Sequence, residues 1–272
     1  MVTQAIIPLA GLGTRLLPLS SVIPKELLPI NGKPNLEYIM EECIEAGIKQ
    51  FIFVVPKNRP SIKKYFFNDG FYKKILKKKK NDKRLKNVFK RLKKLQKMIK
   101  FVYQNKPEGT GHAVLQCKKY LKGTHFLMLL ADDLIVKKNC SKEMISLHRK
   151  TKGSVIATRK VERRTVSRWG ILGFKNKTKN SFLINEVIEK PKLSEAPSNY
   201  AIIGRYILPR KILSVLKMQG RGKGGEIHIT DAIKTLVKKD EKFYGNIFKG
   251  KYIDCGTLDG FIKSGLTISK YL

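Results

Sequence analysis

The chain has 272 residues, of which 42% are hydrophobic, which is enough to build one large domain or two small ones around a buried core. Its formal net charge of +36 first suggests a nucleic-acid partner, but only 12 of the 57 basic residues are arginine, whose bidentate guanidinium dominates base readout. We therefore expect no specific nucleic-acid partner, and we interpret the lysine excess as solvated surface charge with a weak, salt-sensitive affinity for polyanions.

The sequence also argues against a membrane-spanning or secreted protein and against a zinc protein. No apolar run approaches the length needed to cross a bilayer, and residues 1–10 have neither the basic start nor the apolar length of a secretory signal. The four cysteines form no C-x-x-C pair and the four histidines no H-E-x-x-H pattern, which argues against a zinc site. We expect a cytoplasmic protein with reduced, buried thiols and no membrane partner.

The beginning of the chain predicts a parallel sheet. The apolar run 5–9 is typical of a buried strand, and residues 34–47 carry one apolar stripe at helical spacing, with proline at the start and glycine at the end. The continuous apolar run 51–55 predicts a second buried strand. A strand, a helix and another buried strand form a βαβ unit, in which the two strands are parallel.

The pattern from residue 59 to residue 100 is helical and basic, with 15 Lys and Arg against one acid in residues 73–100, and it predicts an excursion packed beside the sheet. A third strand is expected over 101–104, followed by a helix that opens near Thr110. The seven residues 125–131, which contain no strong polar interruption, predict a fourth, central strand.

The second half of the chain has a different character. After a helix over about 142–150, four strand-like segments follow without long helices between them, which predicts a mixed or antiparallel extension of the sheet. Short helices are expected over 210–217 and 229–238, then a last strand pair and a terminal helix from Leu258. The two members of that strand pair are residues 243–248 and 252–256. The loop 219–225, with four glycines, is expected to be the most mobile segment.

The junction after the first strand has the composition of a phosphate-binding loop. Gly11 and Gly13 follow the strand directly, and the basic residues Arg15 and Lys25 come shortly after them. A buried strand that runs into a glycine-bearing loop is how α/β proteins present backbone N–H groups to a phosphate. By itself, this pattern fits an ordinary turn equally well.

Seven segments taken together resolve the ambiguity. They are PLAGLGTRLLPLSSVIPKELLPINGKP, QNKPEGTGHAV, LLADD, EKPK, APSNYAIIGRY, GGEIHITDAI and IDCGT. In this order, over residues 6–261, the chain resembles the bacterial UTP–glucose-1-phosphate uridylyltransferases; the basic region 73–100 is the least recognisable part. Relatives acting on dTTP tend to carry a glycine-richer first loop and K-Q-L-L-P, so K-E-L-L-P, APSN and D-C-G favour the uridylyl branch.

The resemblance implies an α/β, Rossmann-like nucleotidyltransferase fold, with a mixed, mostly parallel central sheet flanked by helices and a small antiparallel sugar-binding extension. It implies a single domain, with a nucleotide-binding half over 1–135 and a sugar-phosphate-binding half with the C-terminal helix over 136–272. The implied reaction transfers UMP from UTP to glucose 1-phosphate with Mg²⁺ as cofactor and releases pyrophosphate, in a homodimer or homotetramer. Two alternatives stay open: a relative that uses dTTP or another sugar 1-phosphate, and a non-catalytic polyanion-binding relative.

The resemblance also assigns the residues around the nucleotide. Arg15 and Lys25 would neutralise the leaving pyrophosphate, which suits a reaction that depends on positioning and charge neutralisation rather than on a covalent nucleophile. Gln104 and Gly109 would read the uracil edge. The implied nucleotide-binding set is Leu9, Ala10, Gly11, Gly13, Gln104 and Gly109.

The remaining assignments concern the metal and the sugar phosphate. Asp132 follows the fourth strand directly, at the sheet edge where α/β proteins bind ligands, and by resemblance it would hold Mg²⁺ together with Asp254. Lys190 would bind the phosphate of the attacking sugar. The implied sugar-binding set is Gly170, Glu189, Lys190 and Gly204. Three residues stay open between a structural role and a ligand contact: His112, Asp133 and Glu226.

Overall fold

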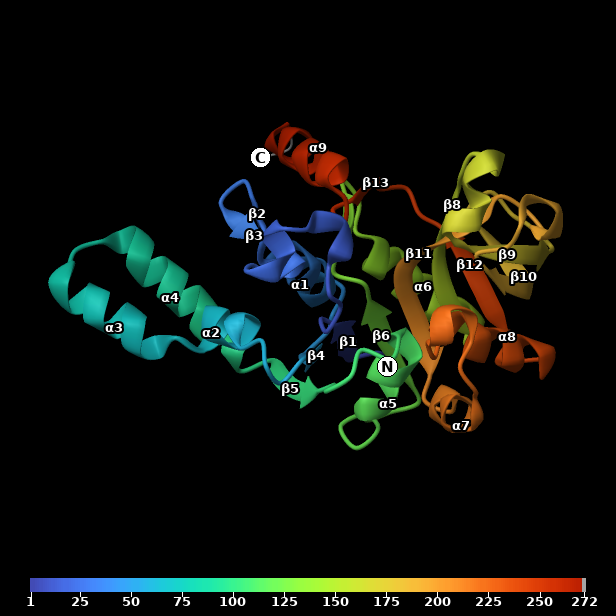
Figure 1. Cartoon of the computed structure of the whole chain (residues 1–272), viewed down its shortest axis with the longest axis horizontal. Helices are drawn as coiled ribbons and strands as arrows, with labels where there is room; N and C mark the ends of the chain where they lie inside the picture. Colours follow the sequence, from blue (N-terminus) through green and yellow to red (C-terminus); the bar gives the residue numbers. More distant parts are fainter. Residues whose placement is uncertain (271–272) are drawn as a thin grey trace.

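The computed structural model describes residues 1–270 and arranges them around a nine-stranded sheet (Figure 1). In spatial order the strands are β5 (Ile99–Tyr103), β4 (Gln50–Val55), β1 (Gln4–Pro8), β6 (His125–Leu129), β11 (Tyr200–Pro209), β8 (Ser154–Lys160), β12 (Phe243–Ile247), β10 (Ser181–Glu189) and β9 (Gly170–Lys175). The four strands expected in the first half are therefore present, and β6 lies inside the sheet, as its unbroken apolar run predicted.

The two halves of the sheet differ in strand direction. The neighbours β5, β4, β1 and β6 are all parallel, which confirms the βαβ prediction. β11 runs antiparallel to both of its neighbours, β6 and β8, and so joins the two halves. Beyond it, β12 is parallel to β8, while β10 pairs antiparallel with β12 and β9. The mixed sheet with an antiparallel extension is thus the observed architecture.

Two small ribbons lie outside the main sheet. β2 (Pro29–Ile30) pairs with β3 (Lys33–Pro34), and β7 (Asp133–Val136) pairs antiparallel with β13 (Lys251–Asp254). The predicted pairing of residues 243–248 with 252–256 is wrong. β12 joins the main sheet between β8 and β10, while β13 pairs with β7. The difference matters for the site because the β7–β13 register sets Asp133 opposite Asp254.

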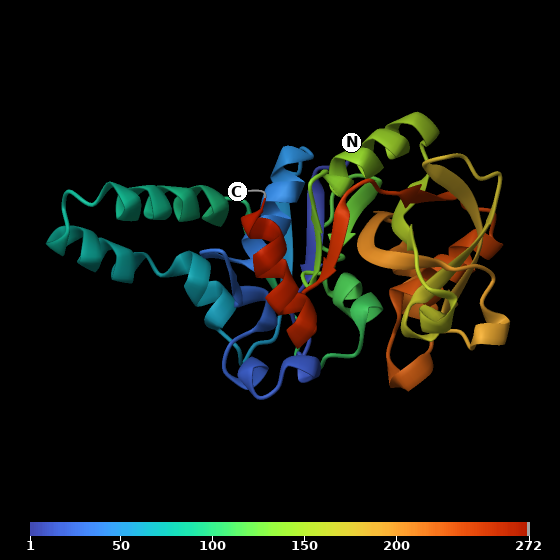
Figure 2. The ribbon, with the colours of Figure 1, turned by 90° about the horizontal axis from the view of Figure 1, so that it is seen from above.

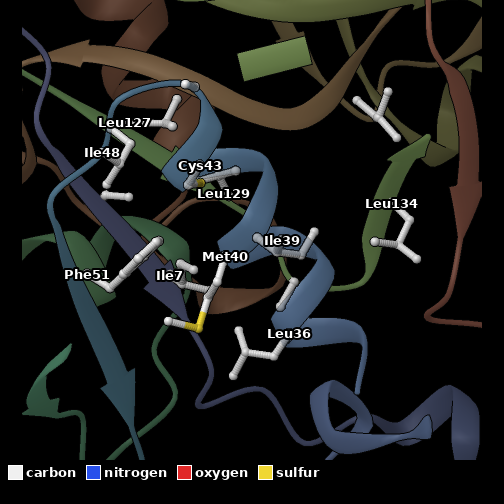
Figure 3. Close-up of a cluster of buried hydrophobic side chains, with 14 of the residues drawn as sticks. Ile7, Leu36, Ile39, Met40, Cys43, Ile48, Phe51, Leu127, Leu129 and Leu134 are labelled. Carbon is white, nitrogen blue, oxygen red and sulfur yellow. The ribbon is translucent and has the colours of Figure 1, made fainter. Parts of the chain in front are cut away.

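Helices cover both faces of the sheet, and alternate strand residues point into two separate cores. In β1, Ile7 faces the cluster beneath α1 (Asn35–Glu45) and α6 (Cys140–Thr151), whereas Ile6 faces α5 (Thr110–Gln116), α7 (Ile212–Met218) and α8 (Ile229–Lys238). Figure 3 shows the first core, with α1 lying across the strands. The side chains labelled on α1 in that view are Leu36, Ile39, Met40 and Cys43, four of the five residues of the predicted stripe. The fifth, Ile44, is 37% exposed and lies outside this core.

The basic region forms a helical hairpin that projects from the body of the protein (Figures 1 and 2). It consists of α2 (Ser61–Phe67), α3 (Asp69–Lys78) and α4 (Lys83–Gln96). Phe66, Leu92 and Leu95 are buried and attach its base to the first core, but α3 has no buried residue. The excursion is therefore packed beside the sheet only at its base, and most of its lysines are exposed, as expected for solvated charge.

The last helix, α9 (Leu258–Ser269), packs against β13 and β2 (Figure 2). All four cysteines are buried, as the sequence predicted, and none of them forms a disulfide within residues 1–270. Within residues 1–270, no helix is both long and apolar enough to cross a membrane.

Candidate active site

Two adjoining cavities open at the carboxyl ends of the central strands. The first, of about 410 Å³, is lined by the glycine loop after β1 and by the segment before α5. The second, of about 270 Å³, lies toward the antiparallel extension. Leu130 and Asp132 line both cavities, so a molecule in the first would meet a molecule in the second at Asp132.

The structure brings nearly all of the predicted site residues together. The first cavity is lined by Ala10, Gly11, Gly13, Lys25, Gln104 and Gly109. The second is lined by Arg15, Gly170, Glu189, Lys190, Gly204 and Asp254. Leu9 differs from the rest of its predicted set: its side chain is buried in the first core and its N–H donates to Val54 O of β4.

The loop after β1 is shaped by Gly13. This residue has φ +68°, a left-handed conformation that favours glycine, and a Cβ there would come within 3.1 Å of the Ser20 side chain. The Ser20 hydroxyl donates to Gly13 O at 2.8 Å, which holds the turn. Gly11 has open space where a Cβ would be. The loop therefore lets a ligand approach its backbone closely.

Two carboxylates and two cations meet between the cavities. Lys25 Nζ lies 2.6 Å from Asp132 Oδ2, and Arg15 bridges Asp132 Oδ2 at 3.4 Å and Asp254 Oδ2 at 3.5 Å. Burial alone would lower the pKa of Lys25, but the Asp132 carboxylate outweighs it, so the pKa of Lys25 is raised. In turn, burial would raise the pKa of Asp132, but Lys25 lowers it, so this carboxylate is held ionised.

The same carboxylates have the chemistry of a divalent-cation site. A Cβ on Gly256 would lie 2.7 Å from Asp132 Oδ2 and 3.1 Å from Asp254 Oδ1, so the backbone leaves a cradle into which both carboxylates point. Cys255 N donates to Asp132 O at 2.7 Å and ties the two segments together. Two carboxylates supplemented by substrate phosphates are a usual arrangement for Mg²⁺. Asp132 and Asp254 therefore fit such an ion.

On the far side of the first cavity, Gln104 lies next to the loop before α5. Gln104 is only 3% exposed, and its Nε2 donates to Gly109 O at 3.3 Å. Gly109 has φ +101°, and a Cβ there would come within 2.7 Å of Ile227 O, so only glycine fits. His112 contacts Gln104 and is not among the described residues that line the cavity, whereas Glu226 does line it.

The second cavity presents a carboxylate and an ammonium group to its interior. Glu189 Oε2 accepts from Thr230 Oγ1 at 2.9 Å, which orients the carboxylate. Lys190 has φ +45°, its N–H donates to Trp169 O at 3.0 Å, and its Nζ lies 3.9 Å from Glu189 Oε1. A Cβ on Gly170 would come within 3.2 Å of Glu189 Oε2, so glycine there leaves room for that carboxylate.

Asp133 lies in the wall of the second cavity. Its Oδ1 accepts from the Tyr252 hydroxyl at 2.5 Å, and its Oδ2 accepts from Gly204 N at 3.1 Å. Burial, and then the neighbouring Asp132 charge, raise the pKa of Asp133 to about 6. A Cβ on Gly204 would lie 2.3 Å from Asp133 Oδ2. Asp133, which the sequence left open, therefore begins β7 and fixes the strand that carries Gly204.

A buried ion pair lies next to Leu130 and Gly204, which line the cavities, and the sequence did not predict it. Arg205 Nη2 lies 2.9 Å from Glu42 Oε2, and Arg205 Nη1 donates to Leu130 O at 3.2 Å and to Gly204 O at 3.1 Å. Ser141 Oγ donates to Glu42 Oε1 at 2.6 Å. The guanidinium thus joins β11 to the end of β6. The available signal was a lone arginine inside the otherwise apolar segment 200–208.

Glu26 is a buried acid in the wall of the first cavity and sets up a pH-dependent prediction. It is 2% exposed, and burial raises its pKa from 4.5 to about 7. Its contribution to stability is therefore fully present below pH 4.5 and is lost as the pH rises through 7. At pH 8, Glu26→Gln should raise the free energy of unfolding by up to about 3 kcal/mol.

Chemical denaturation of Glu26→Gln at pH 4.5 and pH 8 would measure this effect. We expect the gain at pH 8 to shrink toward zero at pH 4.5. Glu186→Gln, on an exposed position of β10, is the matched control and should show no such pH-dependent difference. Equal stability of Glu26→Gln and the unaltered protein at both pH values would contradict the assignment.

Comparison with known proteins agrees with this geometry. Residues 4–270 match the family model described as nucleotidyl transferase. The chain belongs to the nucleotidyl transferase family. Its α/β fold, with a central sheet and flanking helices, is the fold of that family. The match also spans both of the cavities described above.

Individual relatives of this nucleotidyltransferase carry more specific names. It is 39% identical to UTP–glucose-1-phosphate uridylyltransferase 2 of Staphylococcus saprophyticus, covering 97% of this chain and 90% of the relative. It is 37% identical to UTP–glucose-1-phosphate uridylyltransferase 2 of Streptococcus pyogenes, covering 97% and 89%. A solved UDP-glucose pyrophosphorylase in complex with UDP-glucose superposes with a TM-score of 0.86, at 34% identity and full coverage of both chains. A UTP-bound enzyme of this type from Acinetobacter baumannii gives a TM-score of 0.83 at 32% identity.

Proposed function

We propose that this nucleotidyltransferase transfers UMP from UTP to glucose 1-phosphate, forming UDP-glucose and releasing pyrophosphate. The observation that carries the proposal is the pair of adjoining cavities that share Asp132 and Leu130. One cavity offers a glycine loop with an amide-bearing wall, which suits a nucleotide, and the other offers Glu189 and Lys190, which suit a sugar phosphate. The relatives named for this reaction share the whole length of the fold.

The nucleotide would lie in the first cavity. The backbone of the loop from Gly11 to Gly13 would approach the triphosphate, with Gln104 and Gly109 at the base. Arg15 and Lys25 would stabilise the negative charge that builds on the leaving pyrophosphate. Both cations contact Asp132 at the boundary between the cavities, which supports a role beside the reacting phosphate rather than at the base.

The sugar phosphate would lie in the second cavity and attack directly. Glu189, oriented by Thr230, would accept hydrogen bonds from sugar hydroxyls, while Lys190 would hold the attacking phosphate close to the α-phosphorus. A phosphate oxygen is already ionised at neutral pH, so this reaction requires no general base and no covalent nucleophile. This agrees with a site built from cations, carboxylates and glycine backbone.

We propose Mg²⁺ as the cofactor, held by Asp132 and Asp254. When bound, the ion would supply positive charge that neutralises part of the negative charge converging in the transition state. The two carboxylates face the same cradle at Gly256, and Arg15 spans them.

We further propose a cytoplasmic enzyme that works as a homodimer or homotetramer. The four buried, free thiols suit a reducing compartment. Leu258, Ile262 and Leu266 form an exposed apolar stripe along α9, the kind of surface that subunits bury when they associate. Light scattering coupled to size-exclusion chromatography would measure the assembly, and a monomer at micromolar concentration would contradict this part of the proposal.

Pyrophosphate release over a panel of nucleotides and sugar phosphates tests the activity. The panel would combine UTP, dTTP, CTP and ATP with glucose 1-phosphate, galactose 1-phosphate and mannose 1-phosphate, with Mg²⁺ and with EDTA. We expect the highest kcat/KM for UTP with glucose 1-phosphate, and no turnover in EDTA. A preference for dTTP would instead assign a thymidylyltransferase, and no turnover with any pair would indicate a non-catalytic relative.

A further inference from the structure

The amide group of Gln104 has a defined orientation. The nitrogen Nε2 lies 3.3 Å from Gly109 O and 2.9 Å from His112 Nδ1. A backbone carbonyl oxygen only accepts hydrogen bonds, so the part of the amide that faces Gly109 must be the NH₂ group. One of its hydrogens is directed at Gly109 and the other at His112. Gln104 therefore has no further hydrogen to donate.

The orientation of Gln104 indicates which tautomer the neutral His112 ring adopts. Because Nδ1 accepts a hydrogen bond from Gln104, it carries no proton, and a neutral ring must hold its proton on Nε2. Glu108 Oε2, an acceptor, lies 3.5 Å from that nitrogen. The Gln116 Nε2 atom lies 2.8 Å from it, and a 180° turn of the Gln116 amide would bring the amide oxygen to this place. Glu108 is itself held by an ion pair with Arg221.

The one remaining polar atom of Gln104, Oε1, is available to a ligand. Gln104 lines the first cavity, and among the residues that the structure describes none donates a hydrogen bond to its Oε1. We propose that His112 is a positioning residue that holds Gln104 with Oε1 toward the base, so that the cavity accepts a ring N–H and selects uracil over cytosine. This proposal rests on the nucleotide-binding role of the first cavity.

The selectivity follows from the ring nitrogen of each base. Uracil carries a hydrogen on N3, which Gln104 Oε1 can accept. Cytosine has a lone pair at N3, so two acceptors would face each other at a side chain that is only 3% exposed. Leaving an acceptor unsatisfied in this way commonly weakens binding by about ten- to a hundredfold. If the amide were free to turn, its NH₂ group would suit cytosine, and the selectivity would fall.

Two substitutions of His112 separate positioning from mere packing. In His112→Phe the ring remains but no atom accepts from Gln104, so the amide becomes free to turn. In His112→Asn the Oδ1 atom can occupy the place of Nδ1 and still accept. The measurement is kcat/KM for UTP and for CTP with glucose 1-phosphate as the second substrate. We expect the UTP-to-CTP ratio to fall about tenfold or more in His112→Phe and to be largely kept in His112→Asn.

Further readouts distinguish this role from a loss of structure. The KM for glucose 1-phosphate and the kcat at saturating UTP should change little in His112→Phe, because Lys190 and Asp132 are untouched. Nitrogen-15 NMR of the unaltered protein labelled in histidine should show the His112 ring protonated at Nε2 and unprotonated at Nδ1. This spectrum needs neither the variants nor turnover.

Two results would overturn the inference: a proton on Nδ1 of the neutral ring, or an unchanged UTP-to-CTP ratio in a folded His112→Phe. If His112→Phe does not fold, the ratio in His112→Asn and the spectrum still decide. An unaltered protein that turns over no uridine nucleotide would remove the proposed function, and the inference with it. That outcome is distinct from an active enzyme whose selectivity ignores His112.

Discussion

Asp132→Asn should lower kcat with UTP and glucose 1-phosphate by about a thousandfold or more, the scale of effect seen when a group that stabilises developing charge is removed. Asp132 is the residue at which the two cavities meet, and its carboxylate contacts both Lys25 and Arg15. Asparagine keeps the shape but removes the charge that would hold Mg²⁺ and order both cations. Steady-state pyrophosphate release across a range of Mg²⁺ concentrations measures the loss.

Asp259→Asn is the matched control for this experiment. Asp259 is an exposed acid in the first turn of α9, five residues beyond Asp254, and among the described residues it lines neither cavity. We expect it to retain full activity. Thermal melting should show that Asp132→Asn is folded. Arg15, one of the two cations that lose the Asp132 charge, is 56% exposed, so water can solvate it in the variant. Full Mg²⁺-dependent activity in Asp132→Asn would refute its role in holding the metal.

Lys190→Met should raise the KM for glucose 1-phosphate by about 10- to 100-fold, because a hydrogen bond to a charged group contributes about 1.5–3 kcal/mol. The KM for UTP should change little, since Lys190 lines the second cavity and UTP would lie in the first. Methionine preserves most of the side-chain length and removes only the charge. Initial rates measured with each substrate varied in turn separate the two constants.

Lys192→Met provides the comparison for Lys190→Met. Lys192 is exposed, two residues further along, and among the described residues it lines neither cavity. Its removal lowers the net charge by the same amount, so any general effect of charge on the approach of anionic substrates appears in both variants. A similar rise in KM for both substrates in Lys190→Met, or an equal effect in Lys192→Met, would show that Lys190 does not bind the sugar phosphate specifically.

The sequence predicted those parts of the fold in which local pattern and tertiary packing agree. The strands around Ile6 and Ile52 were predicted because both faces of these strands are buried, which produces unbroken apolar runs. The stripe on α1 was visible because only one face of that helix meets the sheet. The site residues could be predicted as a set because seven motifs occur in a fixed order, although no local pattern shows that Asp132 and Lys25 touch.

Other features depend on pairings that no local pattern encodes. The segment beginning at Asp133 is a strand of only four residues, and its partner, ending at Asp254, is separated from it by more than a hundred residues of chain. Likewise, the projection of the basic hairpin depends on how few of its side chains reach the core, which apolar spacing alone does not reveal. The contact between His112 and Gln104 depends on the conformation of the loop that joins them, in which Gly109 O also accepts from Gln104. No sequence pattern encodes this conformation.

The buried pair of Arg205 and Glu42 restricts how this chain can change during evolution. Removing one partner would strand the other charge in the core at a cost of about 3–5 kcal/mol, out of a typical stability of about 5–15 kcal/mol. A lineage that replaced either residue first would pass through a poorly folded ancestor. Replacement of Arg205 would also leave the carbonyls of Leu130 and Gly204 without their shared donor. The two positions, 163 residues apart, are thus expected to persist or to be replaced together.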